Sequence, residues 1–140
     1  MIVIDEYLAM RVVFASDGWP TDLPDTEDLV LPTSRHWRLL QRIHGPGTGQ
    51  LSQRLAALAP AERDTLRFPH PEVLQILDPR PLLDEAARLG ARFGGGWLID
   101  ETLAAGLHNG SVLWFGTERN VGRLLADAAE ELGITIHVAT

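Results

Sequence analysis

Short apolar segments alternate with amphipathic segments along this chain, beginning with the segment Met1-Ile2-Val3-Ile4-Asp5-Glu6. Its apolar residues are β-prone, and two carboxylates follow them directly. A run this short and this apolar is typical of a strand that is buried on both faces in a parallel sheet. The pattern predicts a central strand that ends at Asp5, at the sheet edge where open α/β folds place their ligands.

The second half of the chain alternates helical and extended patterns with short connections. The sequence predicts a helix from Trp97 to about His108, a strand at Val112–Phe115 and a last strand at 134–138. Between these two strands, apolar residues from Val121 to Leu132 recur at helical spacing, and Gly133 is a suitable C-terminal cap. The alternation predicts the α/β class, with a central, mostly parallel sheet of about four to five strands flanked by helices.

The first half of the chain is predicted to be mainly helical, with one further strand at Leu29–Leu31. Thr33 or Ser34 is a suitable N-cap for the helix that follows this strand. The region 68–81 carries four prolines, which exclude a central strand or a long helix there. The predicted helices before residue 91 are 7–14, 33–43, 50–58, 60–66 and 82–90.

Composition narrows the classes of function. The 140 residues suit a single domain over 1–140, and 45% hydrophobic with 22% charged residues is ordinary for a globular protein. There is no cysteine, so a metal would be held by carboxylates or histidine. No apolar segment approaches the length of a membrane span and no signal-peptide pattern opens the chain, which predicts a cytoplasmic protein.

The charge of the chain is strongly acidic. The formal net charge is −7, and an expected exposed loop at 16–28 holds five of the acidic residues. This balance argues against broad non-specific binding of nucleic acid. It does not exclude a nuclease whose carboxylates hold divalent ions, because the ions reverse the local electrostatic field.

Three acidic positions are predicted to meet at one edge of the sheet. Asp5 ends the first strand, and Asp100 lies with Glu101 in the first turn of a helix. Glu118 follows the strand at Val112–Phe115. Clustered carboxylates are costly to ionise unless a cation joins them, and Mg²⁺ or Mn²⁺ prefers oxygen ligands of this kind. Alternatively, each acid is an ordinary solvated residue at a strand end, at a helix start or in a loop.

Four segments, taken in order, carry a resemblance to a known family. Ile2-Val3-Ile4-Asp5 is an opening strand with an aspartate at its end, and residues 96–110 place Asp100 before an alanine-rich helix. Residues 112–120 are a strand with an acidic loop, and residues 124–138 are a closing helix and strand. In this order they resemble the PIN domain, the small α/β fold of metal-dependent ribonucleases that includes VapC-type toxins. The middle of the chain fits this family only in outline.

The resemblance implies a site and an activity. Asp5, Asp100 and Glu118 would be the catalytic residues that hold Mg²⁺ or Mn²⁺, and the ion would activate water for in-line attack on a phosphodiester. The implied protein is an endoribonuclease that acts on RNA, and as a toxin it would have an antitoxin partner. A homodimer is implied as well, since PIN relatives commonly dimerise.

Two departures from the family pattern lead to a second hypothesis. The usual second acid, a glutamate, is absent from the helix at 33–43, and Arg38, or else Arg35, stands near its place. Glu118 stands where aspartate is usual, and Asn120 stands where a further aspartate often lies. An arginine that faces the site would weaken metal binding or hold a phosphate instead. The second hypothesis is therefore a catalytically impaired PIN-like module that binds RNA or protein.

Two further interpretations remain at this point. Arg35, Arg38 and Arg119 would line a path for RNA phosphates, although a solvated arginine face is commoner. A third hypothesis is a doubly wound regulatory domain in which Asp5 belongs to an acidic pocket, and a strand order unlike that of a PIN domain would favour it.

Overall fold

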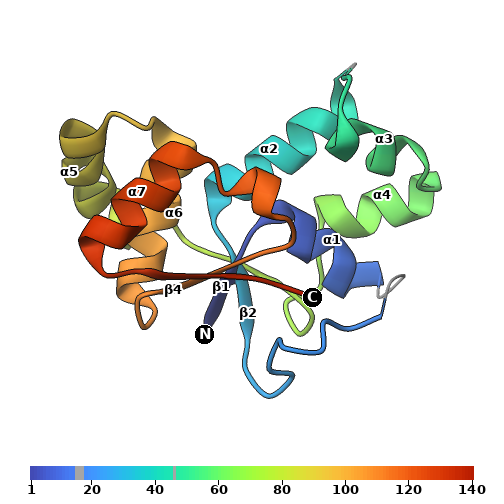
Figure 1. Ribbon diagram of the computed structural model, residues 1–140. Helices are drawn as coiled ribbons and strands as arrows, with labels where there is room; N and C mark the ends of the chain where they lie inside the picture. The colour runs from blue at the N-terminus through green and yellow to red at the C-terminus, as the bar shows by residue number, and fades with distance from the viewer. Residues whose placement is uncertain (15–17, 46) are drawn as a thin grey trace.

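The computed structural model describes residues 1–14, 18–45 and 47–140, and it places five parallel strands at the centre of the molecule (Figure 1). The strand order is β3-β2-β1-β4-β5, so the first strand is the central one, as predicted. Val3 of β1 pairs with Val30 of β2 on one side and with Leu113 of β4 on the other. The strands are β1 (Ile2–Ile4), β2 (Leu29–Leu31), β3 (Gln75–Ile76), β4 (Val112–Phe115) and β5 (Thr135–Val138). The predicted α/β class, with its mostly parallel sheet, is confirmed and is consistent with a PIN-like three-layer fold.

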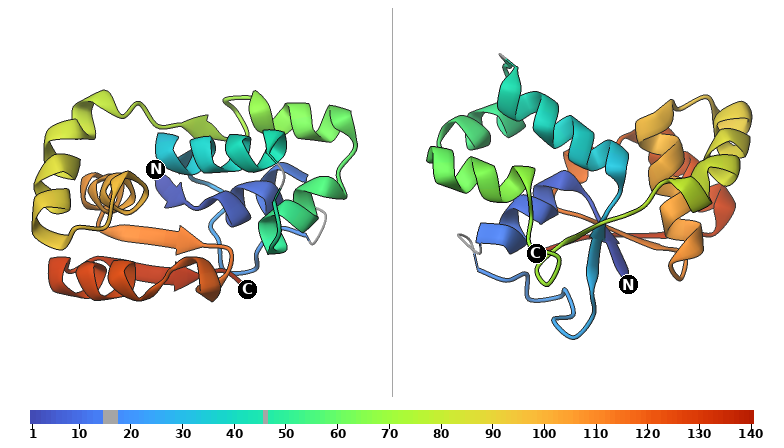
Figure 2. Two further views of the ribbon diagram at one scale, coloured as in Figure 1. Left: turned by 90° about the horizontal axis from the view of Figure 1, so that it is seen from above. Right: turned by 180° about the vertical axis from the view of Figure 1, so that it is seen from behind.

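Helices cover both faces of this sheet. Figures 1 and 2 show α5, α6 and α7 grouped on one side, apart from α1, α3 and α4 on the other. The α-helices are α1 (Glu6–Phe14), α2 (Thr33–His44), α3 (Gln50–Ala56), α4 (Pro60–Arg67), α5 (Leu83–Phe93), α6 (Trp97–His108) and α7 (Arg123–Leu132). Two short 3₁₀ helices, η1 (Arg80–Leu82) and η2 (Glu118–Asn120), precede α5 and α7.

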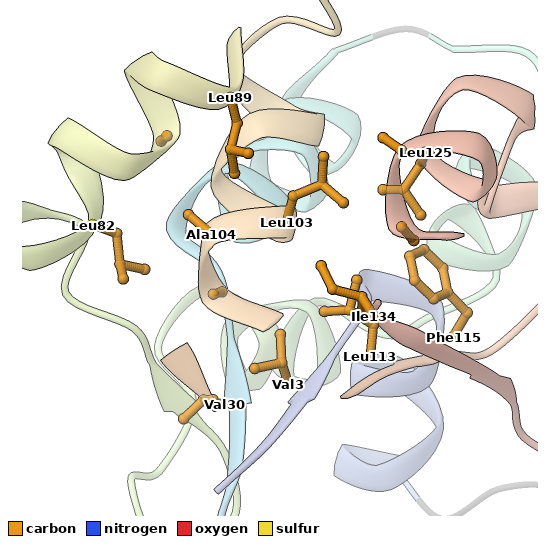
Figure 3. Close-up of a cluster of buried hydrophobic side chains, with 14 residues drawn as sticks. Val3, Val30, Leu82, Leu89, Leu103, Ala104, Leu113, Phe115, Leu125 and Ile134 are labelled. Atoms are coloured by element: carbon orange, nitrogen blue, oxygen red, sulfur yellow. The ribbon is translucent and has the colours of Figure 1, made fainter. Parts of the chain in front are cut away.

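Alternate residues of each strand pack into two different apolar cores, because successive side chains of a strand point to opposite faces of the sheet. Val3, Val30 and Leu113 point toward α5, α6 and α7, where Leu103 and Leu125 meet them (Figure 3). On the opposite face the intervening strand residues pack with α1; they are Ile2, Ile4, Leu29, Leu31 and Trp114. A third apolar cluster joins α1 to α2, α3 and α4. The central strand is therefore covered on both faces.

Some predicted boundaries are wrong. Helix α5 continues through Gly90 to Phe93, and its C-cap is Gly94, whose φ of 69° lies in the left-handed region that suits glycine. The N-cap of α2 is Pro32, and neither Thr33 nor Ser34 caps it with a side chain. The proline-rich region contains no central strand or long helix, as predicted, but it adds β3, a two-residue strand at the edge of the sheet. Of the predicted acidic loop, Ser16 and Asp17 lie outside the described residues, as does Pro46 in the glycine-rich segment 45–49, where the sequence predicts a break between two helices.

None of the helices in the described part of the chain has the length and apolar character that a membrane crossing requires.

Candidate functional site

Asp5 lies at the carboxyl edge of the sheet, where β1 passes into α1. Its side chain is 2% exposed. Its Oδ1 accepts hydrogen bonds from the backbone N–H groups of Leu8 (2.9 Å) and Gly116 (2.8 Å). Its Oδ2 accepts one from the side-chain amide of Asn120 at 2.6 Å. The carboxylate thus caps the start of α1 and joins it to the loop after β4.

Glu6, the next residue, is fully buried and is surrounded by donors. Arg38 Nη1 donates to its Oε1 at 2.7 Å, and Asn120 Nδ2 donates to the same oxygen at 2.9 Å. Arg35 Nη1 donates to Oε2 at 3.3 Å. Arg38 also donates to Asn120 Oδ1 at 2.7 Å. We call Asp5, Glu6, Arg35, Arg38 and Asn120 the Glu6 cluster.

Arg35 belongs to the interior of the protein. It is 1% exposed, and its guanidinium lies 5.3 Å from the centre of the Phe115 ring. Its Nε donates to the hydroxyl of Thr102 at 2.8 Å, and that hydroxyl donates in turn to the carbonyl of Leu98. A cation this deeply buried requires a charged partner, and Glu6 supplies it. Arg35 therefore has no free guanidinium to offer to an RNA phosphate.

Asp100 does not join this cluster. A Cβ added at Gly90 of α5 would lie 2.6 Å from Asp100 Oδ2, so the carboxylate faces α5. Its Oδ1 has no hydrogen-bond partner among the described residues. Burial alone raises the pKa of Asp100, and no neighbouring carboxylate contributes to the shift. An aspartate that shared a cation site with Asp5 would feel the charge of Asp5.

Glu101 turns the other way, toward α2. Its Oε1 accepts a hydrogen bond from the backbone N–H of Ser34 at 2.6 Å. This contact satisfies one of the free N–H groups at the start of α2, which has no side-chain cap of its own. Glu101 Oε2 and Ser34 Oγ are buried without a protein partner in the described structure. The glutamate therefore acts as a cap supplied from another helix.

Glu118 lies on the surface. It is the first residue of η2 and is exposed, as is Arg119. Asn120, two residues later, is the side chain of η2 that reaches Asp5 and Glu6. The loop after β4 does approach the predicted site, but an amide enters it instead of a carboxylate.

The predicted ligands do not fit Mg²⁺ or Mn²⁺ as a set. Asp5, Asp100 and Glu118 lie in three different surroundings, and within the described ranges no group of three histidine or acidic residues is placed to hold a metal ion. The oxygens of Asp5 and Glu6 accept hydrogen bonds from Asn120 and from arginine. Guanidinium and amide donors thus occupy directions that a cation would need.

The electrostatics of Asp5 follow from this burial. Desolvation, and next the charge of Glu6, raise the pKa of Asp5 to about 7. Hydrogen bonds from Leu8 and Asn120 and the charge of Arg35 act in the opposite direction without cancelling the effect. Native Asp5 therefore holds its proton over a pH range in which an exposed aspartate has lost it.

This shift predicts a pH dependence of stability. Between the unfolded pKa of 3.8 and the native pKa of about 7, the native state binds more protons than the unfolded state. The contribution of Asp5 to the free energy of unfolding is complete below the unfolded pKa and is lost as the pH rises through the native pKa. Because Asp5→Asn removes the titration, its stability relative to the wild type should rise from about pH 5 to about pH 8. Urea unfolding at several pH values measures the difference, and a constant difference would contradict the assignment.

Two exposed tryptophans lie on α2, which supplies Arg35 and Arg38, and on α6, which supplies Thr102. Trp37 of α2, next to Arg38 in the chain, is 52% exposed, and Trp97 at the start of α6 is 45% exposed. Their ring centres are 6.4 Å apart with an angle of 59° between the planes. Leu124 of α7 is exposed as well, and its Cδ2 lies 3.0 Å from the position of a Cβ at Gly95. Trp37, Trp97 and Leu124 are thus exposed apolar residues on α2, α6 and α7, and α6 packs against both other helices.

Sequence reasoning identified Asp5 and the arginine of α2 but missed the role of Glu6. The sequence did contain an indication of this role. Glu6 follows a buried strand directly, so its backbone lies in the interior and its carboxylate is expected to be buried as well. Arg35 and Arg38 are three residues apart, which places them on one side of a helix. An acid at a buried position and two arginines on one helix face are a pattern typical of an ion-pair network.

No family model matches this chain, and no curated protein or solved structure is significantly similar to it. The resemblance to PIN domains therefore depends on the four sequence segments, with an α/β architecture that is consistent with it.

Proposed function

We propose that this protein is a PIN-like module that binds single-stranded RNA without metal-dependent hydrolysis. The observation that carries the proposal is the Glu6 cluster, in which Arg35 and Arg38 supply positive charge beside Glu6 and Asp5. Arg35 and Arg38 both pair with Glu6, so its carboxylate is compensated by guanidinium groups of the chain without a divalent ion. A nuclease of the implied kind needs those carboxylates free to hold its metal.

The surface beside the cluster supports RNA as the ligand. Proteins that bind single strands stack bases on exposed aromatic rings and place cations along the phosphates. Trp37 and Trp97 supply two such rings, and both side chains are about half exposed. Arg119, next to Asn120 of the Glu6 cluster in the chain, is exposed, and the side chain of Arg123 is 95% exposed, with its nearest acidic partner at 3.8 Å. Of the three arginines predicted to contact phosphates, Arg35 and Arg38 are paired with Glu6, and Arg119 has no side-chain partner among the described residues.

The proposal predicts that RNA binding depends on the tryptophan pair. We expect Trp37→Ala and Trp97→Ala each to weaken binding of a fluorescein-labelled oligouridylate of about twelve nucleotides by roughly tenfold, because stacking contributes about 1–3 kcal/mol per base. Fluorescence anisotropy at several salt concentrations measures the affinity. Phe68→Ala is the matched control, since Phe68 is an exposed aromatic residue on a different part of the surface. Equal affinity of all three variants and the wild type would refute the proposal.

The same samples test the competing function. If labelled RNA is shortened in the presence of Mn²⁺, and Asp5→Asn abolishes the cleavage, the protein is an endoribonuclease and the proposal is wrong. That outcome would restore the toxin hypothesis with its antitoxin partner. The homodimer and the cytoplasmic location are predictions from the resemblance and from the sequence, and size-exclusion chromatography with light scattering tests the homodimer.

A further inference from the structure

Two cavities meet at Val73, at the opposite end of α1 from the Glu6 cluster. The first has a volume of about 460 Å³, and Val13 and Phe14 of α1 line it together with Phe68 and Val73. Phe68 is 75% exposed and Val73 is 46% exposed. Large apolar side chains that gather around a cavity on the surface are typical of an interaction site, whereas single scattered ones are not.

The second cavity is acidic and has an aromatic wall. Its volume is about 310 Å³, and its lining includes Trp19, Asp25, Asp28 and Glu72 next to the shared Val73. The indole N–H of Trp19 donates to the carbonyl of Leu23 at 2.9 Å, which holds the ring in place. Figure 1 shows the loop before β2 and the end of α4 on the same side of the molecule. Among the residues that the structure describes, no arginine lines either of these two cavities.

We infer that this groove docks a basic peptide segment of a partner protein. A bulky apolar side chain of the segment fills the first cavity against Phe14 and Phe68. A lysine or arginine of the same segment enters the second cavity, where the Trp19 ring attracts a cation and the carboxylates of Asp25 and Asp28 complement its charge. The apolar contact supplies affinity, and the charges supply orientation and choice of partner.

The charge of the groove favours a basic peptide over RNA and over a second copy of this chain. The carboxylates of Asp25, Asp28 and Glu72 repel the phosphates of RNA, so the groove is separate from the proposed RNA surface at Trp37 and Trp97. A second copy of this chain would bring a net charge of −7 to an acidic surface. Charge complementarity therefore favours a basic segment from a different protein.

A random twelve-residue peptide library displayed on phage tests the inference with the full chain as bait. We expect the enriched peptides to combine lysine or arginine with leucine or an aromatic residue. One enriched peptide, synthesised with a fluorescein label, should bind at least about tenfold more weakly to Phe68→Ala, because a central apolar anchor of an interface costs about this much when truncated. The double variant Asp25→Asn with Asp28→Asn should weaken binding and also reduce its dependence on salt.

Controls separate this inference from the RNA proposal. All three substituted residues are exposed, so circular dichroism should show unchanged folding. Trp37→Ala should bind the peptide as the wild type does, and oligouridylate should not compete with the peptide. A library that yields no basic peptide dependent on both Phe68 and the two aspartates overturns the inference. Competition by oligouridylate would overturn it too, because RNA would then occupy the groove.

Discussion

Replacing Arg35 with alanine should lower the free energy of unfolding by about 3–5 kcal/mol, the usual cost of removing one partner of a buried ion pair. Arg35 is buried, and Glu6 beside it is inaccessible to solvent, so the substitution leaves a carboxylate inside the protein with a single arginine partner. The hydroxyl of Thr102 loses its donor as well. Urea unfolding monitored by circular dichroism measures the loss.

Two further variants show whether the loss comes from the ion pair. Arg123→Ala removes an arginine that is almost fully exposed, and we expect little change in stability. In the double variant Arg35→Met with Glu6→Gln, both charges are removed and much of the stability should return, because a buried pair replaced by neutral groups is often close to neutral in free energy. A cost below about 1 kcal/mol for Arg35→Ala would show that Glu6 does not depend on this arginine.

Introducing two further carboxylates into the Glu6 cluster should create a binding site for Mn²⁺. The variant Arg38→Glu with Asn120→Asp replaces the two donors that contact Glu6 Oε1 with acids. With Asp5 and Glu6, the cluster then holds four carboxylates in all. Without metal, their repulsion should lower the melting temperature by several degrees. Saturating Mn²⁺ should recover most of this loss, since a ligand at about 100 times its Kd stabilises by about 2.7 kcal/mol.

The wild type and Arg38→Gln are the comparisons for this experiment. Both keep Asn120, and neither gathers enough carboxylates to bind a divalent ion, so their melting temperatures should be the same in Mn²⁺ and in EDTA. Differential scanning fluorimetry provides the measurement. A wild type that responds to Mn²⁺ as strongly as the double variant would mean that Asp5 and Glu6 already bind the ion, in conflict with their occupation by arginine and amide donors.

Most of the fold followed from local sequence patterns. The buried central strand, the positions of α6 and β4 and the glycine that ends α7 were predicted, because each depends on the periodicity or the backbone preference of a few neighbouring residues. The strand β3 was not predicted. Two residues between prolines carry no periodic pattern, and β3 becomes a strand because β2 pairs with it.

The candidate site was predicted only in part, and the helix α6 shows why. Asp100 and Glu101 are neighbours in the chain, and successive side chains on a helix point about 100° apart. Asp100 therefore faces Gly90 of α5 while Glu101 faces Ser34 of α2. The sequence places both acids in the first turns of a helix, but the direction of each depends on how the whole helix packs against its neighbours.

The sequence by itself determined the α/β class and the place of Asp5 at the end of a central strand, because a short apolar run followed by carboxylates has few other solutions. Only the tertiary structure decided which charged groups meet there. Arg35 and Arg38 reach Glu6 from 29 and 32 positions away, and Asn120 reaches it from 114 positions away. The rotation of α2 and the path of the loop after β4 bring cationic and amide donors to the carboxylates, so the expected centre for a metal ion is a cluster whose acids already bind donors of the chain.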